Sequence, residues 1–236
     1  MFRKYRDYKP GEFFVVFADT AWGGLDYCSA QFISKTSLDV PVVYHKKELA
    51  SDMTPRIHEE LNRIYRETRV KPVIAFERNN GGVAEIQRLN RLNREQNYII
   101  YTEKTKTGTT EGEQQTDKLG YTTSSSTRPV MLSMLKDAVD NRLIRIYDKP
   151  TINEMFSFVI KQTAGGWKAQ AESGAHDDLI MALALGLYIR DEKYRHLPVG
   201  AESLLKNRAT SHFETDIKNK IRKAIHDVTE EMLSLI

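Results

Sequence analysis

Three acidic positions in the sequence lie where an apolar segment ends or begins. Asp19 and Glu77 each close an apolar run, and the doublet Asp177-Asp178 precedes the apolar segment Leu179–Tyr188. Carboxylates that are brought together repel one another, and one of them takes up a proton unless a cation lies among them. A ligand set made only of oxygen atoms, with no cysteine nearby, favours Mg²⁺ or Mn²⁺ over zinc. Two such ions, about 3.5–4 Å apart, suit the in-line cleavage of phosphodiesters.

The segments that carry these acids are predicted to be buried. Residues Phe13–Asp19 form an apolar run without alternation, which is typical of a central strand covered on both faces. Lys71–Glu77 is a shorter run of the same kind, and parallel pairing of the two strands would place both acids at one edge of the sheet. Leu179–Tyr188 is apolar on nearly every side, which predicts a buried helix whose N-terminal dipole favours the negative charge of the preceding doublet.

The chain up to residue 190 predicts an α/β domain with a mixed sheet flanked by helices. An antiparallel meander is indicated by short turns between the strands expected at residues 13–19, 27–34 and 41–44. Parallel neighbours joined by right-handed crossovers are indicated by alternating helices and strands at residues 54–68, 71–77, 83–94 and 98–101. The later predicted elements are a long loop at 102–127, a helix at 128–141, a strand at 143–147, a segment of undecided type at 151–160 and a hairpin at 161–172.

The chain is expected to have three parts. Residues 1–12 are basic and polar and end at Pro10-Gly11, which indicates a leader or the remnant of a linker. Residues 13–190 contain the predicted domain. Residues 191–236 are charged, and aliphatic residues at helical spacing predict a helical C-terminal extension there.

The composition narrows the class of protein. The formal net charge is only +3 over 236 residues, which by itself does not indicate nucleic-acid binding. Cys28 is the single cysteine, so the chain has no internal disulfide framework, as expected in a reducing compartment. The sequence shows neither a signal peptide nor an apolar stretch long enough to cross a bilayer, so we expect a protein that is not secreted and has no membrane partner.

Four motifs resemble the nuclease domain of phage terminase large subunits, in the same order and over about residues 13–190. They are Phe17-Ala-Asp19 with Asp26-Tyr27, Phe76-Glu77-Arg-Asn-Asn-Gly-Gly82, Lys118-Leu-Gly-Tyr121 with Thr127-Arg128-Pro129, and Gly174-Ala-His-Asp-Asp178-Leu179. The resemblance implies an RNase H-like fold, related to RuvC-type resolvases. It also implies a metal-dependent endonuclease that cuts concatemeric double-stranded DNA during genome packaging.

The resemblance assigns roles to individual acids. The catalytic acids that hold two Mg²⁺ or Mn²⁺ ions would be Asp19, Glu77 and Asp178. Asp177 stays the alternative metal ligand within its doublet. Related nucleases often have a further ligand one helical turn on, where this chain has Met181. Two roles stay open for His176: a metal ligand, or a solvated residue that caps the start of the helix.

By the same resemblance, the partners would be double-stranded DNA, the terminase ATPase domain, the small terminase subunit and the portal protein, in the host cytoplasm. The sequence contains no Gly-x-x-x-x-Gly-Lys-Ser/Thr phosphate loop, so we expect a nuclease domain without its motor half. The basic residues predicted to contact DNA phosphates are Arg78, Lys104, Lys106, Lys118 and Arg128. Acidic neighbours dilute this patch, which leaves open that several of its lysines are only solvated. Two other functions stay open: a junction resolvase of the same fold, and a catalytically silent module that binds DNA or docks the motor.

Overall fold

The computed structural model of the chain describes residues 1–20, 27–79, 81–107, 114–163, 166–171 and 176–193. Its main sheet is built around β2 (Phe14–Asp19), whose residues are buried up to Asp19. The strand β3 (Tyr27–Ser34) pairs with one edge of β2 in antiparallel fashion, and β5 (Val73–Phe76) pairs with the other edge in parallel fashion. The predicted central position of this strand is therefore confirmed.

The other strands extend the main sheet on both sides of β2. The order is β1-β4-β3-β2-β5-β6, and β9 pairs with β4. The bounds of these further strands are Phe2–Lys4 for β1, Asp39–Lys47 for β4, Ile99–Ile100 for β6 and Arg145–Ile146 for β9. The antiparallel meander and the parallel pairing of β5 with β6 are as predicted. The strand β5, however, is not a neighbour of β4, because it supplies the second edge that the fully buried β2 requires.

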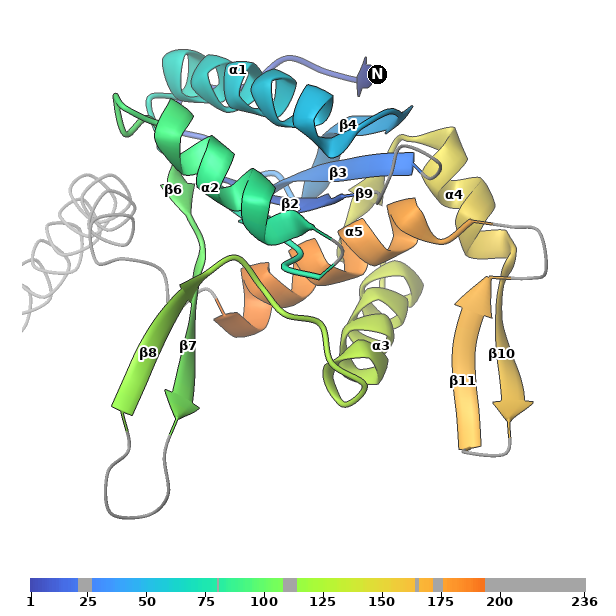
Figure 1. Cartoon of the computed structure of the whole chain (residues 1–236). Coiled ribbons are helices and arrows are strands. Elements are labelled where there is room, and N and C mark those ends of the chain that lie inside the picture. The colour runs from blue at the N-terminus through green and yellow to red at the C-terminus, as the bar shows by residue number, and fades with distance from the viewer. Residues whose placement is uncertain (21–26, 80, 108–113, 164–165, 172–175, 194–236) are drawn as a thin grey trace, which may run out of the picture. The chain divides into compact units, whose positions relative to one another are not determined.

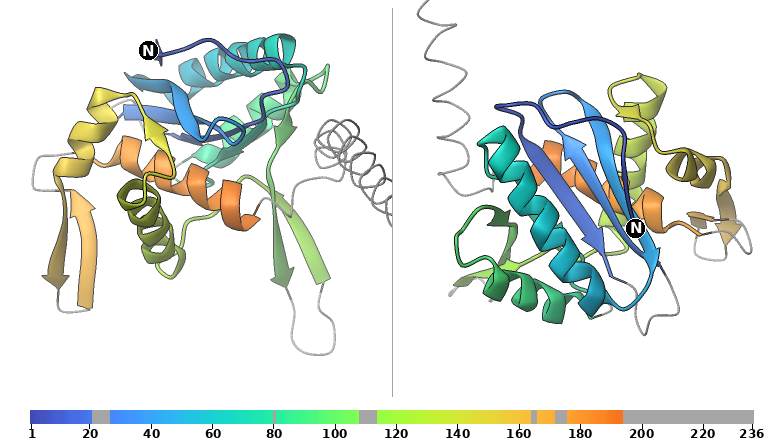
Figure 2. Two further views of the ribbon diagram at one scale, coloured as in Figure 1. Left: turned by 180° about the vertical axis from the view of Figure 1, so that it is seen from behind. Right: turned by 90° about the horizontal axis from the view of Figure 1, so that it is seen from above.

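Helices cover both faces of this sheet, as Figures 1 and 2 show. On one face, α1 (Ala50–Thr68) and α2 (Gly82–Leu92) pack over the sheet. On the other face lies α5 (Asp178–Tyr188), which α3 (Thr127–Asp140) and α4 (Lys149–Phe156) contact. A π-helical turn, Ile189–Lys193, continues α5. None of the helices in these described ranges has the length and apolar character that crossing a bilayer requires.

The alternation of side chains along β2 divides it between the two faces. Phe14, Val16 and Ala18 lie in the core beneath α1 and α2. The intervening residues face α5: a Cβ placed on Gly186 of α5 would lie 3.5 Å from the Cβ of Phe17. Asp19 has the same parity as Phe17, so the end of β2 directs its carboxylate to the side of the sheet that α5 covers.

The first twelve residues, predicted as a leader or the remnant of a linker, contact the body of the domain. The strand β1 pairs with β4. Arg6 donates hydrogen bonds to both carboxylate oxygens of Asp39, at 2.7 and 2.5 Å, and Arg3 donates to those of Asp148, at 2.5 and 2.9 Å. The basic residues of this segment therefore attach it to the body of the domain through ion pairs, which have no signature in local hydrophobic patterning.

Two further segments resolve differently from their predictions. The expected loop at 102–127 contains an antiparallel pair of strands, β7 (Thr102–Thr107) and β8 (Gln114–Leu119). The undecided segment 151–160 divides between α4 and β10 (Phe158–Thr163), and β10 pairs with β11 (Gly166–Ala171) as the predicted hairpin. Asp148 fixes the start of α4 because its carboxylate accepts a hydrogen bond from the amide of Thr151. The predicted extension at 191–236 lies outside the described residues beyond Lys193.

Candidate active site

The pairing of β2 with β5 brings Asp19 and Glu77 to one edge of the sheet. Ala18 is paired with Phe76, and the amide of Glu77 donates a hydrogen bond to the carbonyl of Ala18 at 3.0 Å. Ala18 and Phe76 both lie in the core beneath α1 and α2. By alternation, the two acids that follow them share the opposite side of the sheet, where α5 lies. The structure thus places Asp19 and Glu77 at the same edge of the sheet, as the sequence predicted.

Glycines allow α2 to begin directly against the Glu77 backbone. A Cβ on Gly82, the first residue of α2, would lie 1.6 Å from the carbonyl oxygen of Glu77 and 3.5 Å from Oγ1 of Thr20. Gly81 has a φ of 87°, in the left-handed region that favours glycine. The side chain of Asn79 donates a hydrogen bond to Oε1 of Glu77 at 3.0 Å. The motif that follows Glu77 therefore positions this acid.

The doublet at the start of α5 divides its two carboxylates between different surroundings. Oδ2 of Asp177, the residue that precedes the helix, accepts a hydrogen bond from Nη2 of Arg128 at 2.8 Å. The side chain of Asp178 is 17% exposed, against 33% for Asp177. Burial raises the pKa of Asp19 well above its usual value, and the charges of Glu77, Asp178 and then Asp177 raise it further, in that order. Asp178 therefore acts on Asp19 more strongly than Asp177 does.

The chemistry of this set of acids fits a hard divalent cation. Asp19, Glu77 and Asp178 offer only oxygen atoms, and their mutual repulsion in a buried setting is what a cation would relieve. Within the part of the chain that the structure describes, no three histidine, cysteine, aspartate or glutamate side chains are placed closely enough to form a metal site as they stand. Glu77 and Asp178 nevertheless act electrostatically on Asp19 across this edge of the sheet.

Met181 and His176, the two positions considered for a further metal ligand, have different surroundings. Met181 is buried, with 5% of its surface exposed, so the position one turn into α5 contributes to the core. The Nδ1 atom of His176 is 3.8 Å from Oδ2 of Asp178, and the side chain of His176 is 57% exposed. Its ring meets that of Tyr27 edge to face, with the ring centres 5.3 Å apart. His176 is thus near the doublet, and its role as a ligand stays a prediction.

The structure also brings polar residues to this site that the sequence analysis did not select. Ser29 and Gln31 of β3 and Glu154 of α4 form hydrogen bonds with backbone groups in the first turn of α5. Ser29 and Gln31 are polar residues that alternate with apolar ones in a buried strand, and this alternation is a signal that could have identified them. Glu154 had no such signal, because its segment could not be assigned to a helix or a strand.

The basic residues predicted to contact DNA are divided between the site and a hairpin. Arg128 reaches the doublet, and Nη1 of Arg78 donates a hydrogen bond to the carbonyl of Leu119 at the end of β8, at 2.6 Å. The other three lie on the paired strands β7 and β8 and are Lys104, Lys106 and Lys118. Figure 1 shows this pair of strands projecting from the body of the domain. The role of the five residues in binding DNA stays a prediction.

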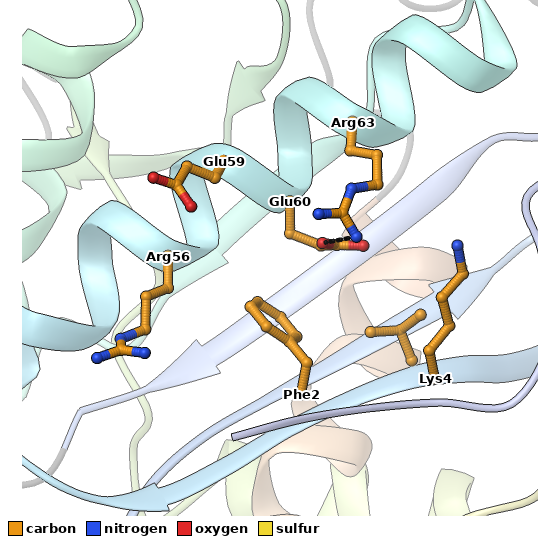
Figure 3. Close-up of a pocket in the computed structure, with 7 residues that line it drawn as sticks. Phe2, Lys4, Arg56, Glu59, Glu60 and Arg63 are labelled. Carbon is orange, nitrogen blue, oxygen red and sulfur yellow. Dashed lines mark ion pairs between the residues drawn. The ribbon is translucent and has the colours of Figure 1, made fainter.

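A cavity of about 190 Å³ lies away from these acids, between α1 and the strands β1 and β4. Figure 3 shows its charged lining, in which Arg63 pairs with Glu60 at 3.1 Å. The residues that line it are Phe2, Lys4, Val42, Arg56, Glu59, Glu60 and Arg63. None of them belongs to the set of acids around Asp19, and the cavity is on the face of the sheet opposite to α5.

Solved structures with the same fold are nuclease domains of large terminases. The match to the large terminase nuclease of thermophilic phage G20c with bound cobalt has a TM-score of 0.58 at 19% identity and covers 79% of this chain and 86% of that one. For the nuclease domain of Thermus phage P74-26, the TM-score is 0.57 at 17% identity, with 80% and 85% covered. For that of P22, it is 0.50 at 13% identity, with 86% and 91% covered. No family model and no curated relative matches the sequence. The predicted RNase H-like fold is therefore confirmed as the fold of these nuclease domains.

Proposed function

We propose that this chain is a divalent-metal-dependent endonuclease that cuts double-stranded DNA, of the kind found in large terminases. The observation that supports this most directly is the convergence of Asp19, Glu77 and Asp178 on one side of the sheet. They come from two strands and a helix that are far apart in the sequence, within a fold that solved terminase nucleases share. Structures of the G20c nuclease carry cobalt, magnesium or zinc, which supports a divalent cofactor here.

The three acids would hold two Mg²⁺ or Mn²⁺ ions, and Asp177 is the alternative ligand in its doublet. When bound, the ions would supply an activated water and stabilise the leaving 3′ oxygen. The chain itself orients the acids: Asn79 holds the carboxylate of Glu77, and Arg128 engages Asp177.

The substrate and partners are proposed on the same basis. The DNA would be held mainly through phosphates, by Arg78, Lys104, Lys106, Lys118 and Arg128, and with little sequence preference. The terminase ATPase domain, the small terminase subunit and the portal protein would be its partners in the host cytoplasm. The net charge of only +3 predicts that this chain alone binds DNA weakly. Contacts made by the motor would add to the affinity of the joined protein.

Digestion of a supercoiled plasmid tests the proposal. The chain is incubated with Mg²⁺, with Mn²⁺ and with EDTA, and the same series is run for Asp19→Asn. The control is Asp140→Asn, which changes an exposed carboxylate of α3 that pairs with Lys136. We expect metal-dependent cutting by the wild type and by Asp140→Asn, and none by Asp19→Asn.

The outcomes separate the proposal from its alternatives. Cutting in EDTA, or by Asp19→Asn in Mn²⁺, would contradict the metal site. Binding of DNA with no cutting under any condition would favour the silent module. Faster cutting of a four-way junction than of linear duplex would favour the resolvase.

A further inference from the structure

The first turn of α5 is capped by a residue from another helix. The first four amides of a helix have no partner within it, and a side chain at the N-cap usually supplies one. Here Asp177 makes no such hydrogen bond and pairs with Arg128 instead. Oε2 of Glu154, on α4, accepts hydrogen bonds from the amides of Leu179 at 3.0 Å and Ile180 at 3.2 Å.

Two buried side chains of β3 hold the carbonyl groups of the same turn. Oγ of Ser29 donates a hydrogen bond to the carbonyl of Asp178 at 3.0 Å. Nε2 of Gln31 donates to the carbonyl of Leu179 at 3.2 Å. Ser29 is also the residue paired with Asp19 across the sheet, so the contact connects the backbone of one acid to the strand beside the other. The turn is therefore bonded on its amide side by α4 and on its carbonyl side by the sheet.

The helix that carries Glu154 is itself fixed to the sheet. The buried Asp148 accepts hydrogen bonds from the amide and the hydroxyl of Thr151, at 2.9 and 2.7 Å. The hydroxyl of Thr151 accepts one from Nε2 of Gln31 at 3.1 Å. Thr151 and Glu154 are three residues apart and thus share a face of α4. Glu154 therefore projects from a helix whose own position is set by the strand that holds α5.

We propose that Glu154 is a positioning residue that holds Asp178 in register with Asp19 and Glu77. The inference depends on the proposed function, because the register matters only if these acids bind ions together. Glu154 lies near a set of like charges, an unfavourable place for a carboxylate without a structural role. Its pKa is raised to about 7, mainly by burial; the amides of Ile180 and Leu179 act to lower it, and the charges of Asp178 and Asp177 act to raise it. What compensates is the pair of buried amides that its oxygen satisfies.

Three substitutions at this position and one matched control test the inference. Glu154→Ala removes the accepting carboxylate. Glu154→Asp shortens the side chain by one methylene, which moves the carboxylate away from the amides. Glu154→Gln keeps an oxygen that can accept hydrogen bonds from both amides. The control is Asn153→Ala, because the side chain of Asn153 is exposed on the same helix. Each variant is compared with the wild type by amide hydrogen exchange without metal and by calorimetric titration with Mn²⁺.

We expect faster exchange at Leu179 and Ile180 in Glu154→Ala and Glu154→Asp, with little change in the rest of α5. We also expect Mn²⁺ affinity to fall roughly 10- to 100-fold, the range found when a residue that orients a metal ligand is lost. Glu154→Gln should retain most of the affinity, and Asn153→Ala all of it. If Glu154→Ala fails to fold, Glu154→Asp carries the test.

Mn²⁺ affinity in Glu154→Asp equal to that of the control would overturn the inference, even if the thermal stability fell. Unchanged exchange at Leu179 and Ile180 would overturn it as well. If the wild type binds no Mn²⁺, the proposed function fails by that result. The exchange data would then show separately whether Glu154 holds the turn.

Discussion

At the scale of single residues, the doublet that begins α5 places two neighbouring carboxylates in different surroundings. Asp177 is engaged by Arg128, whereas Asp178 is the less exposed of the two and acts more strongly on Asp19. The sequence could not separate them, because both precede the same apolar helix. The side chains around the two aspartates do distinguish them, because a carboxylate that an arginine already neutralises gains less from binding a cation.

We predict that Asp178→Ala loses more cleavage activity than Asp177→Ala. The loss in Asp178→Ala should exceed the roughly 100-fold typical of a residue that only orients a metal ligand. Initial rates of plasmid nicking in Mn²⁺ measure both variants. An inactive Asp177→Ala beside an active Asp178→Ala would show that the ligand lies one position earlier.

Asp19→Asn should keep the fold while abolishing cleavage. Burial and the neighbouring acids disfavour the charged form of Asp19, and a hydrogen bond from the Thr20 backbone offsets them only in part, so the neutral amide should relieve a net repulsion. We expect the melting temperature in EDTA to equal or exceed that of the wild type. A clear decrease would mean that the carboxylate has a structural role.

At the scale of elements, the site depends on how closely α2 approaches the end of β5. A methyl group on Gly82 would overlap the carbonyl of Glu77, so Gly82→Ala must displace the helix or the strand end. We predict a loss of about 1–3 kcal/mol in the free energy of unfolding, which is the usual cost of overpacking. Urea unfolding and cleavage rates measure the two effects.

Gly81→Ala is the comparison for that variant. Its cost should come mainly from the left-handed backbone, about 1 kcal/mol, without a direct clash at Glu77. Gly82→Ala should therefore lose more cleavage activity than Gly81→Ala. Equal activity in the two variants would contradict the importance of this contact.

The buried carboxylate of Asp148 should make the attachment of α4 sensitive to acid. Burial alone would raise the pKa of Asp148. Hydrogen bonds from Arg3, Tyr5 and Thr151 outweigh burial and lower the pKa to about 2. An unfolded aspartate titrates near about 3.9, so this group stabilises the fold above that pH and the contribution disappears as the pH falls to about 2. The contribution at neutral pH is about 2–3 kcal/mol, at about 1.4 kcal/mol for each unit of pKa.

Asp148→Asn tests this expectation. We predict a lower free energy of unfolding than in the wild type at pH 7, and a difference that shrinks as the pH falls below about 4. Urea unfolding at pH 7, 4 and 3 measures it. A difference that stays constant with pH would show that the charge of Asp148 does not carry the effect.

At the scale of the whole molecule, DNA affinity should depend on a few phosphate contacts. We predict that replacing Lys104 and Lys106 with alanine weakens binding to all duplex sequences alike and lowers the salt dependence by about two units of slope. Fluorescence anisotropy over a salt series measures this. Unchanged affinity at low salt would place the contacts elsewhere.

The fold and the places of Asp19, Glu77 and Asp178 at the ends of their elements follow from local features of the sequence, whereas several other features do not. Apolar strands identify the centre of the sheet, and the acids that end them are placed by strand direction. Glu154 escapes prediction because the amides it caps belong to another helix. The strand β1 has no apolar pattern, since ion pairs such as Arg3 with Asp148 hold its segment. The paired strands β7 and β8 consist mostly of polar residues and lack the alternation that identifies a half-buried strand.

The position of α5 in the chain has a consequence for when the proposed site is complete. Every strand of the main sheet precedes α5 in the sequence. During synthesis, the sheet with Asp19 and Glu77 would thus leave the ribosome before the helix that brings Asp178. If these acids act together as proposed, a nascent or interrupted chain has no complete set. The order of translation would thereby keep an unselective nuclease harmless to nucleic acid around the ribosome until the domain is finished.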